Sequence, residues 1–345
     1  MSNKPSVSYY LVNFGGPRSK EEIFPFLKAL LNDRDVIWSG LPNLLHRLLF
    51  TRIAKKRAVK IAPDYDLIGG KSPIYEDTEA LASKLTSYLG APVSTFHRYI
   101  PATHAEFLEK ISKDLADEIR IFPMFPQFSY ATTGSIARFF VENLSSQVIR
   151  KMRWVFSYAA DPGYVAVMQQ TLRDFLQENN IAEEETLLLF SAHGVPKQFV
   201  CMGDPYKRDC ENSYNLIRAG FPKALSLLAY QSKFGKGEWL RPYTVDVCEQ
   251  IEDFSQDKKN VVFVPLTFTS DHVETLFEVE TLYLPLVTKK GLKAFRCPAL
   301  NQRDDWVETI AQLMQKNDLV STQMLVRPLL KKCCSGRRPP CQAQA

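Results

Sequence analysis

A histidine stands at the end of a strongly apolar run of the sequence. The segment TLLLFSAHGVP (186–196) is compatible with a buried strand, and it places His193 just before Gly194 and Pro196. A neutral imidazole in such a place can accept a proton or bind a metal ion. Because a lone histidine at a strand end is more often a structural residue, His193 needs a second group before it indicates a site.

A group of ionisable residues follows a second apolar run. The segment FTSDHVETLFEVE (268–280) carries Asp271, His272, Glu274, Glu278 and Glu280 at the start of an expected helix. A capping box and the helix dipole account for Asp271 and Glu274 without any function. They do not account for Glu278, which lies one turn beyond Glu274, where like charges repel each other. Such a stack of carboxylates is tolerable if cations visit it.

The two groups together are compatible with a metal site. His272 and Glu274 are two residues apart and would point in different directions on a regular helix, so we do not expect them to share an ion. A metal shared by Glu274 and His193, from the loops after two different strands, is the better expectation. One imidazole and one carboxylate suit a divalent first-row metal that is held loosely and passed on. The metal would then be a substrate.

Several motifs of other metal and nucleotide sites are absent from the sequence. There is no H-E-x-x-H and no C-x-x-C, so a metalloprotease site or a structural zinc site is not supported. There is also no Walker A sequence and no G-x-G-x-x-G, and the segment NFGGP is too short to indicate a phosphate loop. Nucleotide binding therefore loses its main support.

Apolar runs of strand type alternate with segments of helical periodicity along the whole chain. The runs lie at 7–14, 91–99, 118–125 and 153–158 in the first half, and at 186–192, 224–230, 260–266 and 292–297 in the second. This alternation indicates α/β structure with parallel sheets, and a length of 345 residues favours two domains. We expect an N-terminal domain over 1–155, a C-terminal domain over 156–320 that carries the metal site, and a mobile basic tail over 321–345. Ligands bind at the carboxyl ends of parallel strands, which is where His193 lies.

Two further segments offer side chains for a large ligand. Arg98 and Tyr99 follow the expected second strand, where a guanidinium can hold a carboxylate or form an ordinary surface ion pair. Trp239 lies in the loop YQSKFGKGEWLRP (230–242), where it can form an apolar wall beside a planar ligand or fill a gap in the core. The residues alone leave these alternatives open.

The composition is that of a globular protein without a nucleic-acid partner. Hydrophobic residues make up 45% of the chain, and 43 basic residues against 38 acidic ones give only a mild positive excess. No stretch reaches the roughly 18 apolar residues of a membrane span, and the N-terminus lacks the apolar region of a signal peptide, so we expect a cytoplasmic protein. The segment 41–62 combines a leucine stripe with basic residues. It predicts either a packed helix with a solvated basic face or a peripheral contact with an anionic membrane.

Taken together, these segments resemble those of the ferrochelatases, which insert ferrous iron into a porphyrin in the last stage of haem synthesis. The resemblance runs from about residue 8 to about residue 315. It rests on segments that occur in the family's order, namely LVNFGGP, LNDRDVI, YDLIGGKSPI, RY (98–99), FPQFSYATTGS, SAHGVPKQFVCMGDPY, QSKFGKGEWLRP and FTSDHVETLFEVE. The combination of SAHG and TSDHVETL at this distance is highly specific.

The resemblance implies a fold and a set of roles. The fold is two similar Rossmann-like domains of chelatase type, each a four-stranded parallel sheet flanked by helices, with a porphyrin cleft between them. His193 and Glu274 are implied as the catalytic and metal-binding pair, with a proton or metal path along Asp271, His272 and Glu278. The implied porphyrin contacts are Arg98, Tyr99, Ser129, Tyr130, Thr132, Thr133 and Trp239. The region of about 36–75, which includes 41–62, would form a lip over the cleft.

The implied reaction requires no resident cofactor, because Fe²⁺ is a substrate. Some ferrochelatases hold a [2Fe–2S] cluster on a C-terminal cysteine group and one further cysteine, in some members at the position of Tyr130. This chain has no cysteine there, and the spacing of Cys333, Cys334 and Cys341 differs from that of the family. We therefore expect no cluster.

Other functions compete with the expected conversion of protoporphyrin IX to protohaem, which releases two protons. Coproporphyrin III, giving coprohaem, is the alternative substrate. A cobalt or nickel chelatase would keep a histidine and acid site but would lack TSDHVETL in this form. A non-enzymatic two-domain tetrapyrrole-binding protein of periplasmic type fits the α/β pattern but would require export. The sequence does not indicate an oligomeric state.

Overall fold

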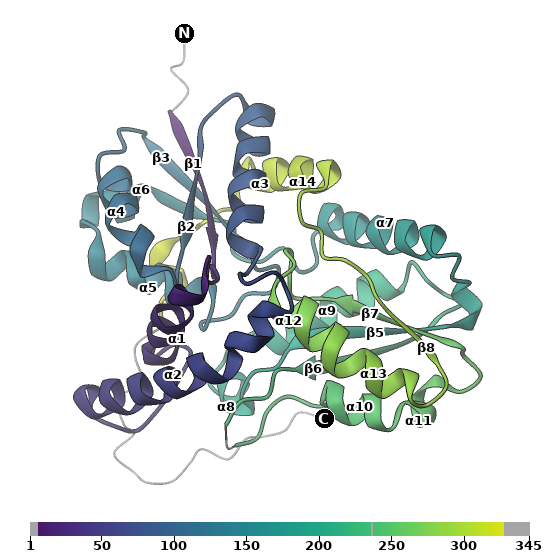
Figure 1. The fold of residues 1–345 in the computed structure, drawn as a ribbon. Coiled ribbons are helices and arrows are strands. Elements are labelled where there is room, and N and C mark those ends of the chain that lie inside the picture. Colours follow the sequence, from purple (N-terminus) through teal and green to yellow (C-terminus); the bar gives the residue numbers. More distant parts are fainter. Residues whose placement is uncertain (1–5, 236, 328–345) are drawn as a thin grey trace. The chain divides into compact units, whose positions relative to one another are not determined.

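The computed structural model describes residues 6–235 and 237–327, which form two compact units (Figure 1). The first unit runs through Phe156 and takes in the chain again from Val307. The second unit runs from Ser157 to Trp306. The first boundary lies next to the expected division at 155/156, and the second lies inside the last helix.

The first unit is built on a five-stranded sheet in the order β2-β1-β3-β4-β9. Four of the strands are parallel and match the expected set, and they are β1 (Val7–Asn13), β2 (Val93–His97), β3 (Glu118–Pro123) and β4 (Met152–Trp154). The fifth, β9 (Val320–Ser321), pairs antiparallel with β4 and was not expected. Two residues are too few to show a hydrophobic period in the sequence.

Helices pack around this sheet and enclose an aromatic core. Phe96, Ile121, Phe140 and Trp154 belong to one cluster of buried residues. The helical elements of this unit are η1 (Lys20–Glu22), α1 (Ile23–Asn32), α2 (Asn43–Asp66), α3 (Ile74–Leu89), η2 (Pro101–Thr103), α4 (His104–Ser112), α5 (Thr133–Asn143), α6 (Ser146–Lys151) and η5 (Thr322–Leu325). Helix α14 (Asp304–Met314) contains the second boundary between the units.

The segment after α14 differs from the expected mobile tail over 321–345 and from the expected end of the second domain at 320. It belongs to the first unit, where β9 extends the sheet and η5 follows. Leu325 is fully buried, and the indole Nε1 of Trp154 donates to Thr322 Oγ1 at 3.0 Å. Strand pairing and apolar burial fix this part of the chain. Residues 328–345 lie outside the described residues.

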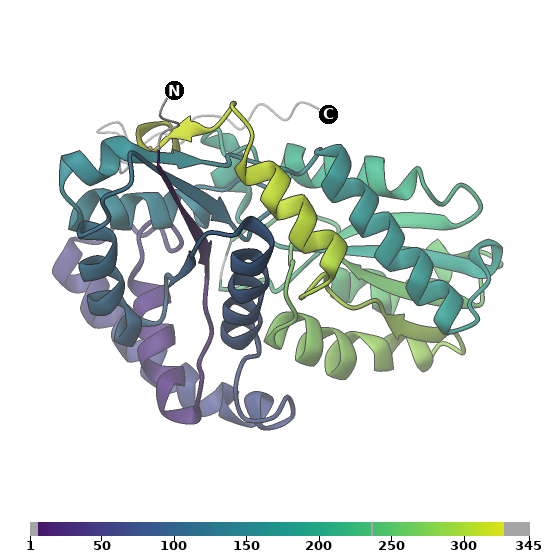
Figure 2. The same cartoon turned by 90° about the horizontal axis from the view of Figure 1, so that it is seen from above.

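The second unit is built on a four-stranded parallel sheet in the order β6-β5-β7-β8. Its strands match the expected set and are β5 (Thr186–His193), β6 (Leu225–Gln231), β7 (Asn260–Pro265) and β8 (Lys293–Arg296). Its helical elements are α7 (Pro162–Glu178), η3 (Glu183–Glu185), α8 (Lys197–Cys201), α9 (Tyr206–Arg218), α10 (Thr244–Glu249), α11 (Ile251–Ser255), α12 (Val273–Phe277), the π-helix η4 (Glu278–Tyr283) and α13 (Leu284–Thr288). In Figure 2 the teal helix α7 and the green helix α13 lie on opposite sides of the strands.

The two sheets share one strand order, which confirms the expected pair of similar α/β domains. In both, the first strand in sequence lies between the second and the third, so the connections leave it in opposite directions. Parallel sheets of this kind bind ligands outside the carboxyl ends of the two strands at that switch point. In the second unit these strands are β5, which ends at His193, and β7, which precedes the segment 268–280.

Candidate active site

His193 is held by its backbone and by one nitrogen of its ring. Its amide donates to Thr267 Oγ1 at 3.0 Å, and its carbonyl accepts from the Tyr206 hydroxyl at 2.8 Å. Ring atom Nδ1 lies 2.7 Å from the carbonyl oxygen of Gly194. Because a carbonyl can only accept, Nδ1 carries a hydrogen, and Nε2 is the ring atom left to take a proton or a metal ion.

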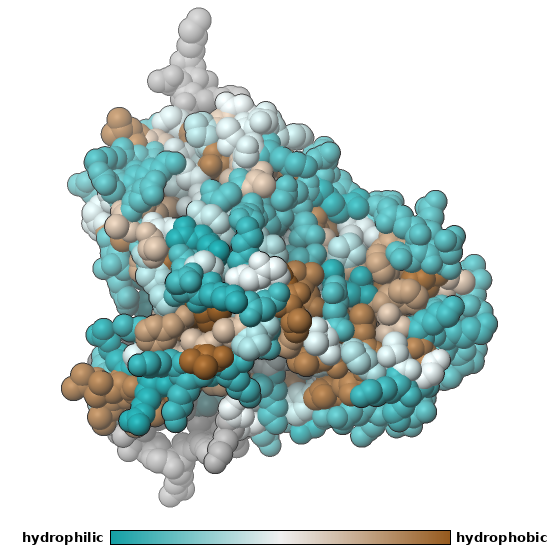
Figure 3. Space-filling model, in the orientation of Figure 1, coloured by the Kyte–Doolittle hydropathy of each residue, from teal (hydrophilic) through white to brown (hydrophobic). Residues whose placement is uncertain are grey.

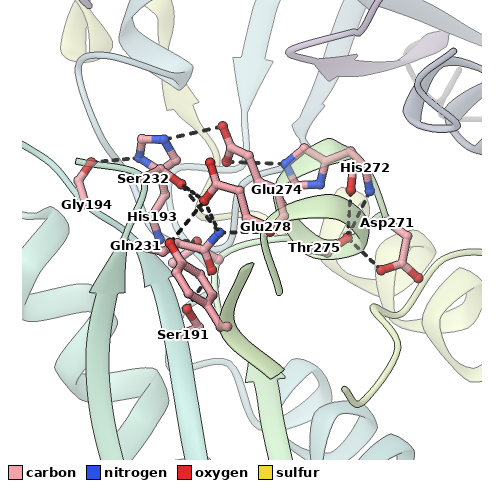
Figure 4. Close-up of polar contacts among 12 residues, drawn as sticks. Ser191, His193, Gly194, Gln231, Ser232, Asp271, His272, Glu274, Thr275 and Glu278 are labelled. Carbon is pink, nitrogen blue, oxygen red and sulfur yellow. Dashed lines mark hydrogen bonds and ion pairs between the residues drawn. The ribbon is translucent and has the colours of Figure 1, made fainter. Parts of the chain in front are cut away.

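Glu274 lies in the first turn of α12 and faces two imidazoles (Figure 4). Its Oε1 is 3.5 Å from His193 Nε2, and its Oε2 is 3.4 Å from His272 Nε2. The sequence-based expectation that His272 and Glu274 point apart is wrong, because His272 is not a helical residue. It is the N-cap of α12, with an extended backbone (φ −162°) that turns its ring toward Glu274.

Glu278 is one turn further along, at the start of the π-helix η4. Its Oε2 accepts hydrogen bonds from Ser232 Oγ at 2.6 Å and from Gln231 Nε2 at 3.1 Å, and the Tyr283 hydroxyl is 3.4 Å away. The donors come from the end of β6, the neighbour of β5. The end of β6 and the segment after β7 therefore meet at this carboxylate.

Asp271 has both of its carboxylate oxygens occupied. Oδ1 accepts from Arg296 Nη1 at 2.9 Å and from Thr275 Oγ1 at 2.8 Å. Oδ2 accepts from Asn301 Nδ2 at 2.9 Å, and the amide of Asp271 donates to Asn301 Oδ1. The structure thus ties Asp271 to neighbouring side chains, so it anchors the start of α12.

The charges within this cluster shift the pKa values of its members. Burial alone lowers the pKa of His193, but the charges of Glu274 and Glu278 and the hydrogen bonds to Glu274 and Gly194 raise that pKa to about 9. Burial works to raise the pKa of Glu274, and the imidazoles of His193 and His272 reverse this and hold it well below its usual range. Burial and the charge of Glu274 raise the pKa of Glu278 to about 7. At neutral pH the His193 and Glu274 pair therefore retains one proton, and Glu278 can gain or lose one.

The arrangement suits transient metal binding. No group of three or more histidine, cysteine or acidic side chains in the described part of the chain is placed to hold a metal ion. If His193 Nε2 and Glu274 Oε1 were both ligands, they would leave most of the coordination of a first-row metal to other molecules. A metal held in this way can be handed on.

Comparison with known proteins decides the family. The ferrochelatase family profile matches residues 9–318. The chain belongs to the ferrochelatase family. A ferrochelatase of Chlamydia caviae is 45% identical over 321 residues, which are 93% of this chain and 99% of that one. A ferrochelatase of Chlamydia pneumoniae is 42% identical over 320 residues, covering 93% and 96% of the two chains.

Family membership makes the chain a lyase of haem synthesis, with ferrous iron and a porphyrin as substrates. The fold has a more distant counterpart among solved structures. SirB from Bacillus subtilis with Fe³⁺ superimposes with a TM-score of 0.53 at 12% identity, covering 90% of this chain and 94% of that one. At this identity the likeness extends to the fold alone, and it agrees with the chelatase-type architecture inferred from the sequence.

The remaining residues expected at a ferrochelatase site lie in the first unit, apart from Trp239. Arg98 donates to Asp33 Oδ2 at 2.7 Å through Nη2 and to Ser135 Oγ at 3.0 Å through Nε. Tyr99 is 1% exposed, and its hydroxyl donates to the same Asp33 oxygen at 2.9 Å. Arg98 keeps a partly exposed guanidinium, whereas Tyr99 is a buried support for it. A direct ligand contact by Tyr99, as expected from the sequence, does not fit this burial.

The segment before α5 also contains both partly exposed and buried members of the expected porphyrin-contact set. Tyr130 and Thr132 are partly exposed, whereas Ser129 and Thr133 are completely buried. The Ser129 carbonyl accepts from the amides of Thr132 and Gly134, so it shapes the turn into the helix. Burial therefore leaves Tyr130 and Thr132 as side chains that can touch a ligand, and it gives Ser129 and Thr133 supporting positions.

Trp239 lies against the loop that follows His193. Pro196 and Trp239 form an isolated antiparallel β-bridge, and the Leu240 amide donates to the Val195 carbonyl at 3.0 Å. A Cβ atom on Gly194 would lie 2.7 Å from the Gln231 carbonyl oxygen and 3.3 Å from the Trp239 ring. Glycine at 194 is thus required by the protein's own packing, and Trp239 keeps a partly exposed ring.

Sequence reasoning missed the residues that hold the cluster in place. These are Ser191, Tyr206, Gln231, Ser232 and Thr267. Gln231 and Ser232 directly follow an expected strand, which is where ligand-binding residues were sought, yet neutral side chains there carry no charge pattern. Their role becomes visible only from the hydrogen bonds.

Proposed function

We propose that this ferrochelatase inserts Fe²⁺ into protoporphyrin IX to give protohaem, with His193 and Glu274 as the catalytic and metal-binding pair. The observation that carries the assignment of residues is the 3.5 Å separation of His193 Nε2 and Glu274 Oε1 at the switch point of the second sheet. Both side chains are partly exposed, which gives a metal ion access to them. No resident cofactor takes part in this proposal, and Cys333, Cys334 and Cys341 lie outside the described residues.

The two protons that leave the porphyrin need acceptors within the same cluster. Nε2 of His193 takes one when the imidazole is neutral, and Glu274 stabilises the imidazolium that forms. Glu278, with a pKa raised to about 7, takes or passes the second. Glu278 also lines a cavity of about 430 Å³ together with Ser232, Tyr283 and Leu286, and this cavity gives protons or metal a way to solvent. His272 holds the far oxygen of Glu274, and Asp271 anchors the segment.

The porphyrin contacts in this proposal are the partly exposed members of the expected set, Arg98, Tyr130, Thr132 and Trp239. Arg98 binds a propionate carboxylate with a guanidinium that Asp33 and Ser135 hold in place. Trp239 supplies an apolar surface for a flat ring. Tyr99, Ser129 and Thr133 support these side chains from within the first unit.

The choice of protoporphyrin rests on charge. Arg98 is the one cationic side chain in the expected porphyrin-contact set, and a single guanidinium suits a dicarboxylate better than a tetracarboxylate. We therefore expect kcat/KM for protoporphyrin IX to exceed that for coproporphyrin III by about tenfold or more, the discrimination that one unpaired charge can provide. Anaerobic incubation with Fe²⁺, followed through the porphyrin absorbance bands, measures both rates. A faster rate with coproporphyrin III would assign that substrate instead, and no metalation of either would leave a tetrapyrrole-binding role.

We also propose that α2 makes a peripheral contact with an anionic membrane on the cytoplasmic side. Leu44, Leu45, Leu48 and Leu49 are 70%, 53%, 61% and 44% exposed, so this apolar surface is not packed against the unit as the alternative required. Figure 3 shows apolar side chains gathered beside hydrophilic ones at the end of α2. The same helix carries the exposed basic residues Arg47, Arg52, Lys55 and Lys56, which complement anionic lipid. No helix in the described part of the chain is long and apolar enough to cross a bilayer.

Replacing Leu48 and Leu49 together by Glu tests this contact. We expect binding to vesicles that contain phosphatidylglycerol to fall by about tenfold or more, because apolar burial and attraction to the surface are lost together. Sedimentation with phosphatidylglycerol and phosphatidylcholine vesicles measures it. Leu115→Glu, at an exposed leucine elsewhere in the first unit, is the matched control. Equal binding by the double variant and the control would refute the membrane contact.

A further inference from the structure

Ser232 has a backbone conformation that disfavours an ordinary side chain. It directly follows β6 with φ at +64°, in the left-handed region where glycine is the residue without a steric penalty. Backbone strain of this kind persists where the surrounding structure compensates for it, and it concentrates at functional sites. Ser232 is also only partly buried, so packing of its small side chain provides little compensation.

The compensation lies in one hydrogen bond to the active-site cluster. Ser232 Oγ donates to Glu278 Oε2 at 2.6 Å, the length of a strong bond to a charged acceptor. Gln231 Nε2 donates to the same oxygen at 3.1 Å. Among the described residues no hydrogen bond reaches Glu278 Oε1, and Figure 4 shows that this oxygen lies on the side of His193 and Glu274.

Gln231 adds rigidity to this arrangement. It is 3% exposed, accepts from Ser191 Oγ at 2.6 Å, and donates to the Glu274 carbonyl at 2.9 Å. Its own carbonyl accepts from the Gly194 amide at 2.8 Å. The end of β6 is therefore locked to the loop after His193 and to the first turn of α12, and the Ser232 hydroxyl projects from a fixed support.

We propose that Ser232 is a positioning residue for metal insertion: its hydroxyl fixes Oε2 of Glu278 so that Oε1 is presented to the His193 and Glu274 pair. The inference rests on the proposed place of Glu278 in the proton or metal path. Without the Ser232 hydroxyl, the carboxylate keeps only the longer bonds from Gln231 at 3.1 Å and Tyr283 at 3.4 Å and can rotate, which moves Oε1 away from the pair. The strained, left-handed backbone conformation of Ser232 is what this placement of the hydroxyl requires.

Ser232→Gly separates positioning from a purely structural role. Glycine relieves the backbone and deletes the hydroxyl, so we expect Tm to stay the same or rise while kcat falls about tenfold, with KM for the porphyrin unchanged. Ser232→Ala deletes the hydroxyl but keeps the strained backbone, so we expect the same loss of kcat without the gain in Tm. Asn180→Gly is the matched control, because Asn180 is an exposed residue with φ at +53° away from the site.

A double variant distinguishes this inference from the proposed role of Glu278. Glu278→Gln should lower kcat, and adding Ser232→Gly to it should cause no further loss, because the two residues act in one step. A wild-type rate for Ser232→Gly alongside a slow Glu278→Gln would overturn the positioning role and leave the path intact. A wild-type rate for Glu278→Gln would overturn the path itself. Additive losses in the double variant would show that Ser232 acts through another group and would also reject the proposal.

Discussion

Replacing His193 by Ala is expected to reduce iron insertion by at least about a thousandfold, within the range that loss of a general base gives, while porphyrin binding persists. The imidazole Nε2 faces Glu274 at 3.5 Å, and the other ring nitrogen is bound to the Gly194 carbonyl, so no second atom of this residue can take over. Anaerobic insertion assays measure the rate, and quenching of protein fluorescence by porphyrin measures binding.

The control for this variant is Lys197→Ala, on the same loop. Lys197 is exposed and pairs only at the surface with Glu238, so its loss should leave the rate within about twofold of wild type. Thermal unfolding of both variants verifies that the loop still folds. Insertion by the His193 variant at more than a tenth of the wild-type rate would remove His193 from its proposed role.

Much of the fold could be predicted because its signals are local. Each of the eight parallel strands overlaps an apolar run, although β4 ends at Trp154, four residues before its run of 153–158 ends. What could not be predicted depends on contacts between distant segments. Strand β9 is two residues long, and it is placed by pairing with β4 rather than by its own pattern. The pair of Asp33 and Arg98 joins residues 65 positions apart, with no periodicity to reveal it.

In the candidate site, too, the features that depend on contacts between distant residues could not be predicted from the sequence. His193 and Glu274 could be identified because ionisable side chains at two strand ends are rare and visible. Their geometry with His272 could not, because it depends on a helix that begins one residue after His272 and leaves that residue extended. The neutral residues that orient the cluster, Gln231 and Ser232, have no charge pattern, and only their hydrogen bonds distinguish them from ordinary strand-end residues.

The two glutamates of the cluster also differ in the direction of their pKa shifts, which the sequence does not reveal. Glu274 lies between two imidazoles and stays ionised, whereas burial and the charge of Glu274 raise the pKa of Glu278 to about 7 against the hydrogen bonds from Ser232 and Gln231, which lower it. Two carboxylates one turn apart thus have opposite shifts from their usual range. In the proposed site, such a pair would supply one permanent charge for the metal and one group that can exchange protons near neutral pH.

Glu274→Gln is the second variant with a large expected effect, and it changes the pH profile as well as the rate. We expect kcat to fall by roughly a hundredfold, because the metal loses its anionic ligand and the imidazolium loses its counter-charge. In the wild type burial lowers the pKa of His193, but the charge and hydrogen bond of Glu274, together with Glu278 and Gly194, raise that pKa to about 9. Protons therefore compete with iron, and kcat/KM for Fe²⁺ should rise as the pH increases toward 9. Without that charge the imidazole deprotonates at lower pH, and the rise should shift to lower pH.

Glu280→Gln is the matched control for this profile, since Glu280 is exposed on the same segment and pairs with Arg296. Its rate and its pH profile should follow those of the wild type. The imidazole resonances of His193, followed by NMR in both variants, give the titration directly, and they should move to lower pH in Glu274→Gln alone. An unchanged midpoint would mean that Glu274 does not control the proton on His193, and the two residues would then have to bind iron independently of each other.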